Sequence, residues 1–184
     1  GIYAMTQNGE NYACSHPILP IKILKNAETG FCKVVIAFLV RNKWQEITVD
    51  KEVISSSSKI VSLSKSGIRV TSENAKSLVR YLSDVEALNE DGITEYVSTS
   101  KLGWINGEFM PYGSNVIFDN ECGLKNTFEA IMSNGDREEW YKLVSDIRRG
   151  GKMEAKIYLV SSFASIMLDF VNALPFIVNL YGTT

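Results

Sequence analysis

Histidine, cysteine and proline are scarce in this chain of 184 residues, which has one, three and four of them. A single histidine excludes catalysis by a histidine pair. The cysteines are odd in number and no secretory signal precedes them, so the sequence predicts reduced thiols and a cytoplasmic protein. Neither sign of charge dominates, because the net charge is only −2. There is therefore no overall basic field for nucleic acid, and any DNA contact needs a local patch.

The sequence also lacks an uninterrupted apolar run long enough for a membrane. Residues 157–180 are mostly apolar, but serines, Asp169 and Pro175 interrupt them. A charge at the bilayer centre costs about 3 kcal/mol on insertion scales. This stretch is better interpreted as a buried helix followed by a buried strand, and no membrane partner is expected.

The overall composition is that of an ordinary globular protein, with 45% hydrophobic and 22% charged residues. Alternating apolar residues over 18–50, broken by turn residues at 26–30 and 41–43, predict a three-stranded antiparallel meander. A short strand at 68–70 precedes an amphipathic helix that begins after Thr71 or Ser72 and continues to Leu88, with one apolar face.

Strands return between residues 95 and 119, and Asn106-Gly107 predicts a tight hairpin there. Helices are expected over 127–133, over 137–149 with Asp136 as the cap, and over 154–173 as a long, largely buried element. A final strand is expected over 176–180. This order favours an α+β fold with a mostly antiparallel sheet and packed helices. The expected organisation is a flexible arm over residues 1–12, an α+β domain over 13–174 and a separate segment from 175.

Four stretches together resemble the domain of unknown function 927 family. They are residues 14–20 (CSHPILP), 71–83 (TSENAKSLVRYLS), 100–119 with the runs SKLGW, FMPYG and IFD, and 162–182 with the runs SFAS and LPF. The resemblance covers the chain from about Tyr12 to its end. It implies the N-terminal region of a helicase-like ATPase of phages, plasmids and other mobile elements. ATP and Mg²⁺ are then cofactors of the full-length protein and not of this part of it.

The resemblance also implies that residues 175–184 begin a P-loop ATPase segment. A phosphate loop has the form G-x-x-x-x-G-K-[ST] after a buried strand. Gly182 would be its first glycine, with Thr183 and Thr184 as early nucleotide-binding loop residues. The second glycine, the lysine and the metal-binding hydroxyl would follow Thr184. We therefore expect no ATPase activity from residues 1–184 alone.

The densest basic patch is the candidate nucleic-acid site, and Lys101 and Arg80 are additional cations. Its members are Arg148, Arg149, Lys152 and Lys156. Lysine and arginine side chains contact phosphates without reading sequence. The alternative is that these cations only stabilise the C-terminal end of a helix.

Other residue groups admit a chemical and a structural interpretation. Cys14, His16, Cys32 and Cys122 have the residue types of a zinc site, but only one short ligand spacing, so no metal is expected. Asp119 and Glu121 would suit Mg²⁺ in a nuclease or primase-like enzyme, or form only an acidic turn. Trp104, Phe109 and Tyr112 would stack on bases or, as we favour, pack within a hairpin.

The sequence thus favours an accessory N-terminal domain of a helicase-like ATPase, serving DNA engagement or assembly. DNA and the remainder of the ATPase chain are the expected partners, and the full-length protein is a candidate oligomer. The alternative is a structural or protein-interaction domain without nucleic-acid binding.

Overall fold

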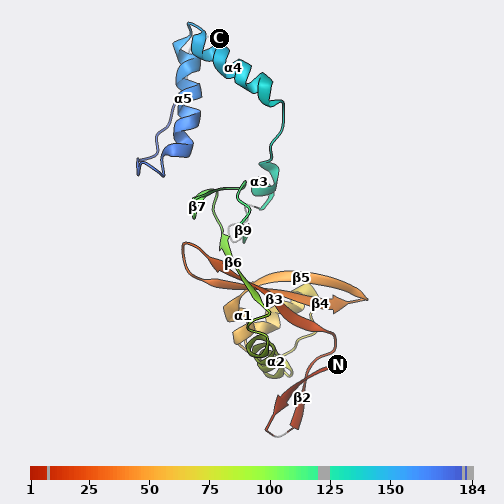
Figure 1. The fold of residues 1–184 in the computed structure, drawn as a ribbon. Coiled ribbons are helices and arrows are strands. Elements are labelled where there is room, and N and C mark those ends of the chain that lie inside the picture. Colours follow the sequence, from red (N-terminus) through yellow and green to blue (C-terminus); the bar gives the residue numbers. More distant parts are fainter. Residues whose placement is uncertain (8, 120–124, 180, 182–184) are drawn as a thin grey trace. The chain divides into compact units, whose positions relative to one another are not determined.

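The computed structural model describes residues 1–7, 9–119, 125–179 and 181 (Figure 1). The chain divides into two compact units, Gly1–Lys125 and Asn126–Thr184. The sequence-based boundaries, after residues 12 and 174, do not coincide with this division. The fold is α+β, and antiparallel pairings predominate among its strands.

The first unit is built on a five-stranded sheet with the order β5-β4-β3-β6-β9. Its strands are β3 (Ile18–Asn26), β4 (Cys32–Val40), β5 (Lys43–Asp50), β6 (Thr94–Thr99) and β9 (Val116–Phe118). The predicted meander is confirmed, because β3, β4 and β5 pair in sequence and antiparallel. The central strand β3 also pairs with β6 in parallel, and β6 pairs with β9 in parallel.

Three helical elements follow the meander, and α1 and α2 lie on one face of the sheet (Figure 1). They are α1 (Lys51–Ser55), the 3₁₀ helix η1 (Ile60–Ser66) and α2 (Ala75–Leu88). Their apolar side chains join those of β3 and β4 in one core that contains Phe38, Ile60, Leu78 and Leu82. Residues 68–70, expected to be a strand, form neither a helix nor a strand and lead into α2.

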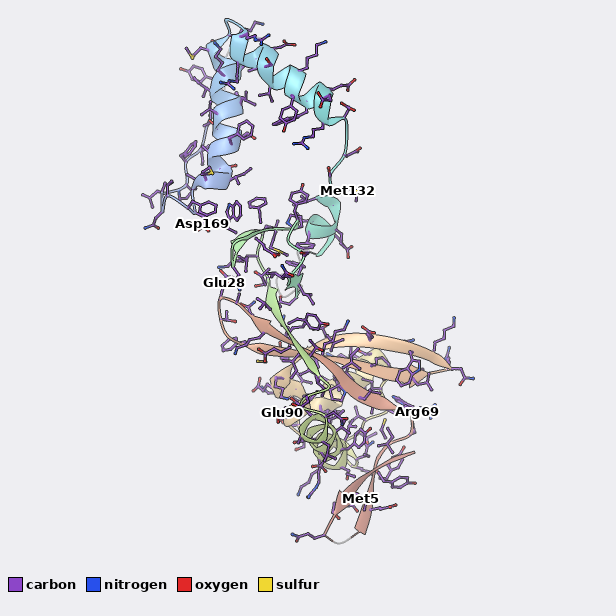
Figure 2. All side chains as sticks on the ribbon, viewed as in Figure 1. Met5, Glu28, Arg69, Glu90, Met132 and Asp169 are labelled. Atoms are coloured by element: carbon purple, nitrogen blue, oxygen red, sulfur yellow. The ribbon has the colours of Figure 1, made fainter. Side chains whose placement is uncertain are left out.

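The first residues differ from the expected flexible arm. They form a hairpin of β1 (Ile2–Thr6) and β2 (Gly9–Cys14), which carries Met5 (Figure 2). Ala4, Ala13 and Cys14 are buried in the core, and the Asn74 side chain donates a hydrogen bond of 2.8 Å to the Ala13 carbonyl. Small apolar residues and one buried amide therefore hold the hairpin against α2. A pattern of large hydrophobic residues in the sequence reveals neither these small residues nor the amide.

A second hairpin joins β7 (Gly103–Ile105) to β8 (Glu108–Met110) through Asn106 and Gly107, as predicted. Both turn residues have positive φ, 49° and 82°, which a two-residue turn of this kind needs. The same geometry recurs in the turn between β4 and β5, where Arg41 and Asn42 have φ of 51° and 60°.

The principal helices of the second unit are α4 (Arg137–Arg149) and α5 (Met153–Met167), which follow α3 (Lys125–Ala130). The α4 boundaries are those predicted, because the Asp136 carboxylate accepts hydrogen bonds from the amides of Glu138 and Glu139. The prediction for α5 is partly wrong: the helix ends at Met167, and none of its residues is buried in its unit. The strand expected over 176–180 is not formed by the described residues 176–179.

Candidate functional site

One end of the five-stranded sheet gathers polar side chains from distant parts of the sequence. The parallel strands β3, β6 and β9 all finish there, at Asn26, Thr99 and Phe118. The antiparallel strand β4 begins at the same end, where the backbone of Lys33 lies opposite that of Asp50, the last residue of β5. Ligand sites of open sheets often lie at the carboxyl ends of parallel strands, so this end is a candidate site.

Asp119 is the centre of this group. Its side chain is 1% exposed, and the ammonium of Lys33, whose side chain is 13% exposed, lies 3.5 Å from Oδ1. Oδ2 accepts hydrogen bonds from Asn26 Nδ2 at 3.1 Å and Ser98 Oγ at 3.3 Å. A buried carboxylate requires such partners, because an unpaired one would carry a large desolvation penalty. These contacts therefore connect β3, β4, β6 and the end of β9.

The side-chain amide of Asn26 also fixes the turn between β3 and β4. Asn26 Oδ1 accepts hydrogen bonds of 3.0 Å from the backbone amides of Glu28 and Thr29. The turn that carries Glu28 lies at this end of the sheet (Figure 2), where Glu28 also pairs with Lys101 at 2.7 Å. The buried carboxylate and the exposed turn thus belong to one hydrogen-bonded network.

A cavity of about 460 Å³ opens at this end of the sheet. Its lining comes from β3, β4, β5 and α1 together with Asp119, and includes Phe31, Lys33 and Asp50. The sequence singled out Asp119 because an acidic pair follows a strand. It gave no sign of Asn26 or Lys33, whose closeness depends on the strand order.

The metal-site alternatives receive no support from the described residues. Among them no group of three histidine, cysteine or acidic side chains is arranged to hold a metal ion. Cys14 Sγ lies 3.8 Å from the His16 ring nitrogens. However, His16 packs on Phe38, whereas Cys32 begins the same strand roughly 20 Å away at 3.3 Å per residue. Glu121 and Cys122 lie outside the described residues.

The predicted basic patch lies on α4 and α5 of the second unit. Arg148 and Arg149, both exposed, are in the last turn of α4 and line a cavity of about 470 Å³ with Tyr141. Lys152 is the N-cap residue of α5, and Lys156 lies one turn further along, partly buried. The structure thus brings the two arginines to one cavity, and the two lysines follow at the start of the next helix.

A cation–π contact between an arginine and a tyrosine of α4 was not predicted. The Arg137 guanidinium lies 5.3 Å from the ring centre of Tyr141 and donates hydrogen bonds of 3.0 and 3.3 Å to its hydroxyl. This contact raises the pKa of Arg137, mainly through the hydrogen bond. The four-residue spacing on a helix was the sequence signal that could have revealed it.

The aromatic residues of the β7–β8 region pack on one another. The Trp104 and Phe109 rings meet edge to face at 5.2 Å, and the Phe109 and Tyr112 rings are stacked at 6.5 Å. The favoured interpretation, packing within the hairpin, agrees with these contacts. Gly182, Thr183 and Thr184, the expected nucleotide-binding residues, lie outside the described residues.

In the part of the chain that the structure describes, no helix is long and apolar enough to cross a membrane. No curated protein matches the chain. The family model described as "Domain of unknown function (DUF927)" matches residues 2–184, which is nearly the whole sequence. The chain therefore belongs to the DUF927 family, as its sequence motifs had indicated.

Proposed function

We propose that this domain is an accessory part of a helicase-like ATPase of phages, plasmids or other mobile elements, and that it engages DNA through the end of α4. The observation that carries the proposal is the cavity of about 470 Å³ that Arg148 and Arg149 line together with Tyr141. Arginine offers planar, charge-assisted hydrogen bonds to phosphate, and tyrosine offers a face on which a base can stack.

The charge along α4 limits where DNA can bind. Glu138 and Glu139 occupy its first turn, and Arg148 and Arg149 its last. The acidic end repels phosphates, so contact is confined to the C-terminal end and the adjacent Lys152. Contacts of this kind reach the backbone and not the base edges, and binding should therefore show little sequence preference.

Fluorescence anisotropy with labelled single-stranded and duplex DNA, each at about 50 and 200 mM salt, tests the proposal. We expect weak binding that falls with salt, because phosphate contacts release counterions. Replacing Arg148, Arg149 and Lys152 with glutamate should reduce the affinity for both DNAs at least tenfold. The matched control replaces Lys43, Lys65 and Lys76, which are exposed cations of the first unit, with glutamate and should change the affinity much less.

An equal loss of DNA affinity in the two triple variants would show that the affinity responds only to net charge. Unchanged affinity in the α4 variant would place any DNA site elsewhere on the chain. Either result contradicts the proposed role of α4.

A protein-interaction role is the second candidate, and α5 favours it. Several apolar side chains of this helix are exposed, including those of Met153, Ile157, Val160 and Phe163. A helix that is apolar on all sides is normally buried. Sedimentation across a range of protein concentrations tests this role: concentration-dependent association that Val160→Glu abolishes would support assembly through α5.

The nucleotide chemistry belongs, in this proposal, to the ATPase part of the longer protein. A phosphate loop there would hold ATP, and Mg²⁺ would neutralise the charge that develops on the phosphates. The domain described here would position that machinery on DNA or assist its assembly.

A further inference from the structure

The cavity at the end of the five-stranded sheet has the properties of a ligand site, independently of the DNA-binding proposal. Its volume of about 460 Å³ is within the usual range of small-molecule pockets, roughly 300–1,000 Å³. Its wall near Asp119 is held by the contacts to Lys33, Asn26 and Ser98 described above. A cavity with hydrogen-bonded walls is preorganised for a ligand.

Most of the charges around the cavity are already neutralised. Lys33 pairs with Asp119, and Lys51 and Glu52 form ion pairs with Glu86 and Lys59. Asp50 differs from these: in the described part of the chain, its exposed carboxylate makes no side-chain hydrogen bond or ion pair. Among the lining residues that the structure describes, Asp50 therefore presents an uncompensated negative charge.

An aromatic ring accompanies this charge. Phe31 lines the cavity and is 72% exposed, so its ring is accessible to a ligand. Its backbone is held on both sides: its amide donates to Thr29 Oγ1 at 3.2 Å, and its carbonyl accepts from the Asn26 amide at 2.9 Å. The turn thus keeps the backbone that carries this ring in place at the cavity.

We propose that this cavity binds an organic cation, an ammonium or guanidinium group. Asp50 would accept charge-assisted hydrogen bonds from the cation, and the face of Phe31 would attract it electrostatically. An anionic ligand is disfavoured, because Lys33 and Lys51, the lysines of the described lining, are paired with carboxylates. The cation is either a free small molecule or the side chain of an arginine or lysine in a protein partner.

Calorimetric titration distinguishes these sources and tests the proposal. The probes are agmatine, a Gly-Arg-Gly peptide with blocked ends, and neutral n-butylurea as the uncharged comparison. We expect saturable binding of at least one cationic probe and none of butylurea. Asp50→Asn should weaken it about tenfold or more, and Phe31→Leu about two- to fivefold. Asp91→Asn, which removes an exposed carboxylate that is not among the lining residues, should leave it unchanged.

Binding of agmatine indicates a free cation, and binding of the peptide alone indicates a protein partner. Asp50→Asn should retain the melting temperature of the parent protein, because the Asp50 side chain makes no capping hydrogen bond on α1. Absence of saturable binding by both cationic probes, or equal binding by the parent and Asp50→Asn proteins, would overturn the proposal.

Discussion

Leu82 and Leu88 show how differently two leucines of one helix contribute to stability. Leu82 is fully buried in the core, whereas Leu88, at the end of α2, is 84% exposed. The sequence placed both on the same apolar face. We expect Leu82→Ala to reduce the free energy of unfolding by about 2–5 kcal/mol, as truncation of buried leucines does. Leu88→Ala on the same helix should change it by less than about 0.5 kcal/mol.

Urea unfolding of both variants measures these effects. Equal effects would mean that the apolar face of α2 is not the core face. That outcome would contradict the packing described above.

The only histidine of the chain predicts a pH dependence. Burial, and to a lesser degree the positive charge of Arg69, lowers the pKa of His16 from its ordinary value of 6.5. The folded chain therefore binds fewer protons than the unfolded chain just below pH 6.5. The stabilising contribution is complete above this value and is lost as the pH falls through the lowered pKa of the folded state.

Urea unfolding at pH 7.5 and 5.5 tests this direction, because carboxylates change little over that range. The parent protein should lose more stability on acidification than His16→Gln does. A greater loss in the variant would show that His16 has the opposite effect.

At the scale of single elements, local patterns predicted much of the fold. The meander, α2, the turn at Asn106-Gly107 and the capped helix α4 all have regular apolar spacing or a specific turn or cap residue. The N-terminal hairpin was missed because its core contacts come from small residues and from the amide of Asn74. The strand expected near Phe176 shows the opposite error, since a short apolar run specifies burial and not secondary structure.

Asn74 provides a test of how the N-terminal hairpin is held. Its Nδ2 donates to the carbonyls of Ala13 and Arg69, and its Oδ1 accepts from the Thr71 amide at 2.7 Å. Asn74→Ala removes these three hydrogen bonds, of which the one to the Ala13 carbonyl is buried, and should reduce the free energy of unfolding by about 1–3 kcal/mol.

Asn89→Ala, at the other end of the same helix, is the matched control, because the hydrogen bond from the Asn89 side chain to the Val85 carbonyl is exposed. It should have an effect of less than about 0.5 kcal/mol. If Asn74→Ala cost no more than the control, the amide would not be what secures the hairpin.

At the scale of the whole molecule, a candidate site could be predicted only where its residues are close together in the sequence. The basic patch was predicted because Arg148, Arg149 and Lys152 are near neighbours in sequence. The cavity at the end of the sheet was not, because Asn26, Lys33 and Asp119 come together only through the strand order β4-β3-β6-β9. Sequence spacing carries no information on such an order.

The nucleotide proposal predicts a difference between two lengths of chain. Residues 1–184 should neither bind ATP tightly nor hydrolyse it, whereas a protein extended past Thr184 should do both. The reason is chemical: the loop amides, the lysine and the metal-binding hydroxyl of a phosphate loop would all follow Thr184. Calorimetry with ATP and Mg²⁺ compares the two. Micromolar binding by residues 1–184 would contradict the proposal, and so would failure of the longer protein.

The parallel pairing of β3 with β6 has a consequence for folding while the chain is being synthesised. The edge of β3 that pairs with β6 begins at Lys22, but its partner begins only at Thr94. At about 5–20 residues per second, several seconds pass before that partner is synthesised. During this interval the nascent chain presents an unpaired strand edge, which invites pairing between neighbouring chains. Slower translation before residue 94 would therefore lower the yield of soluble protein, and chaperone binding to the nascent chain would restore it.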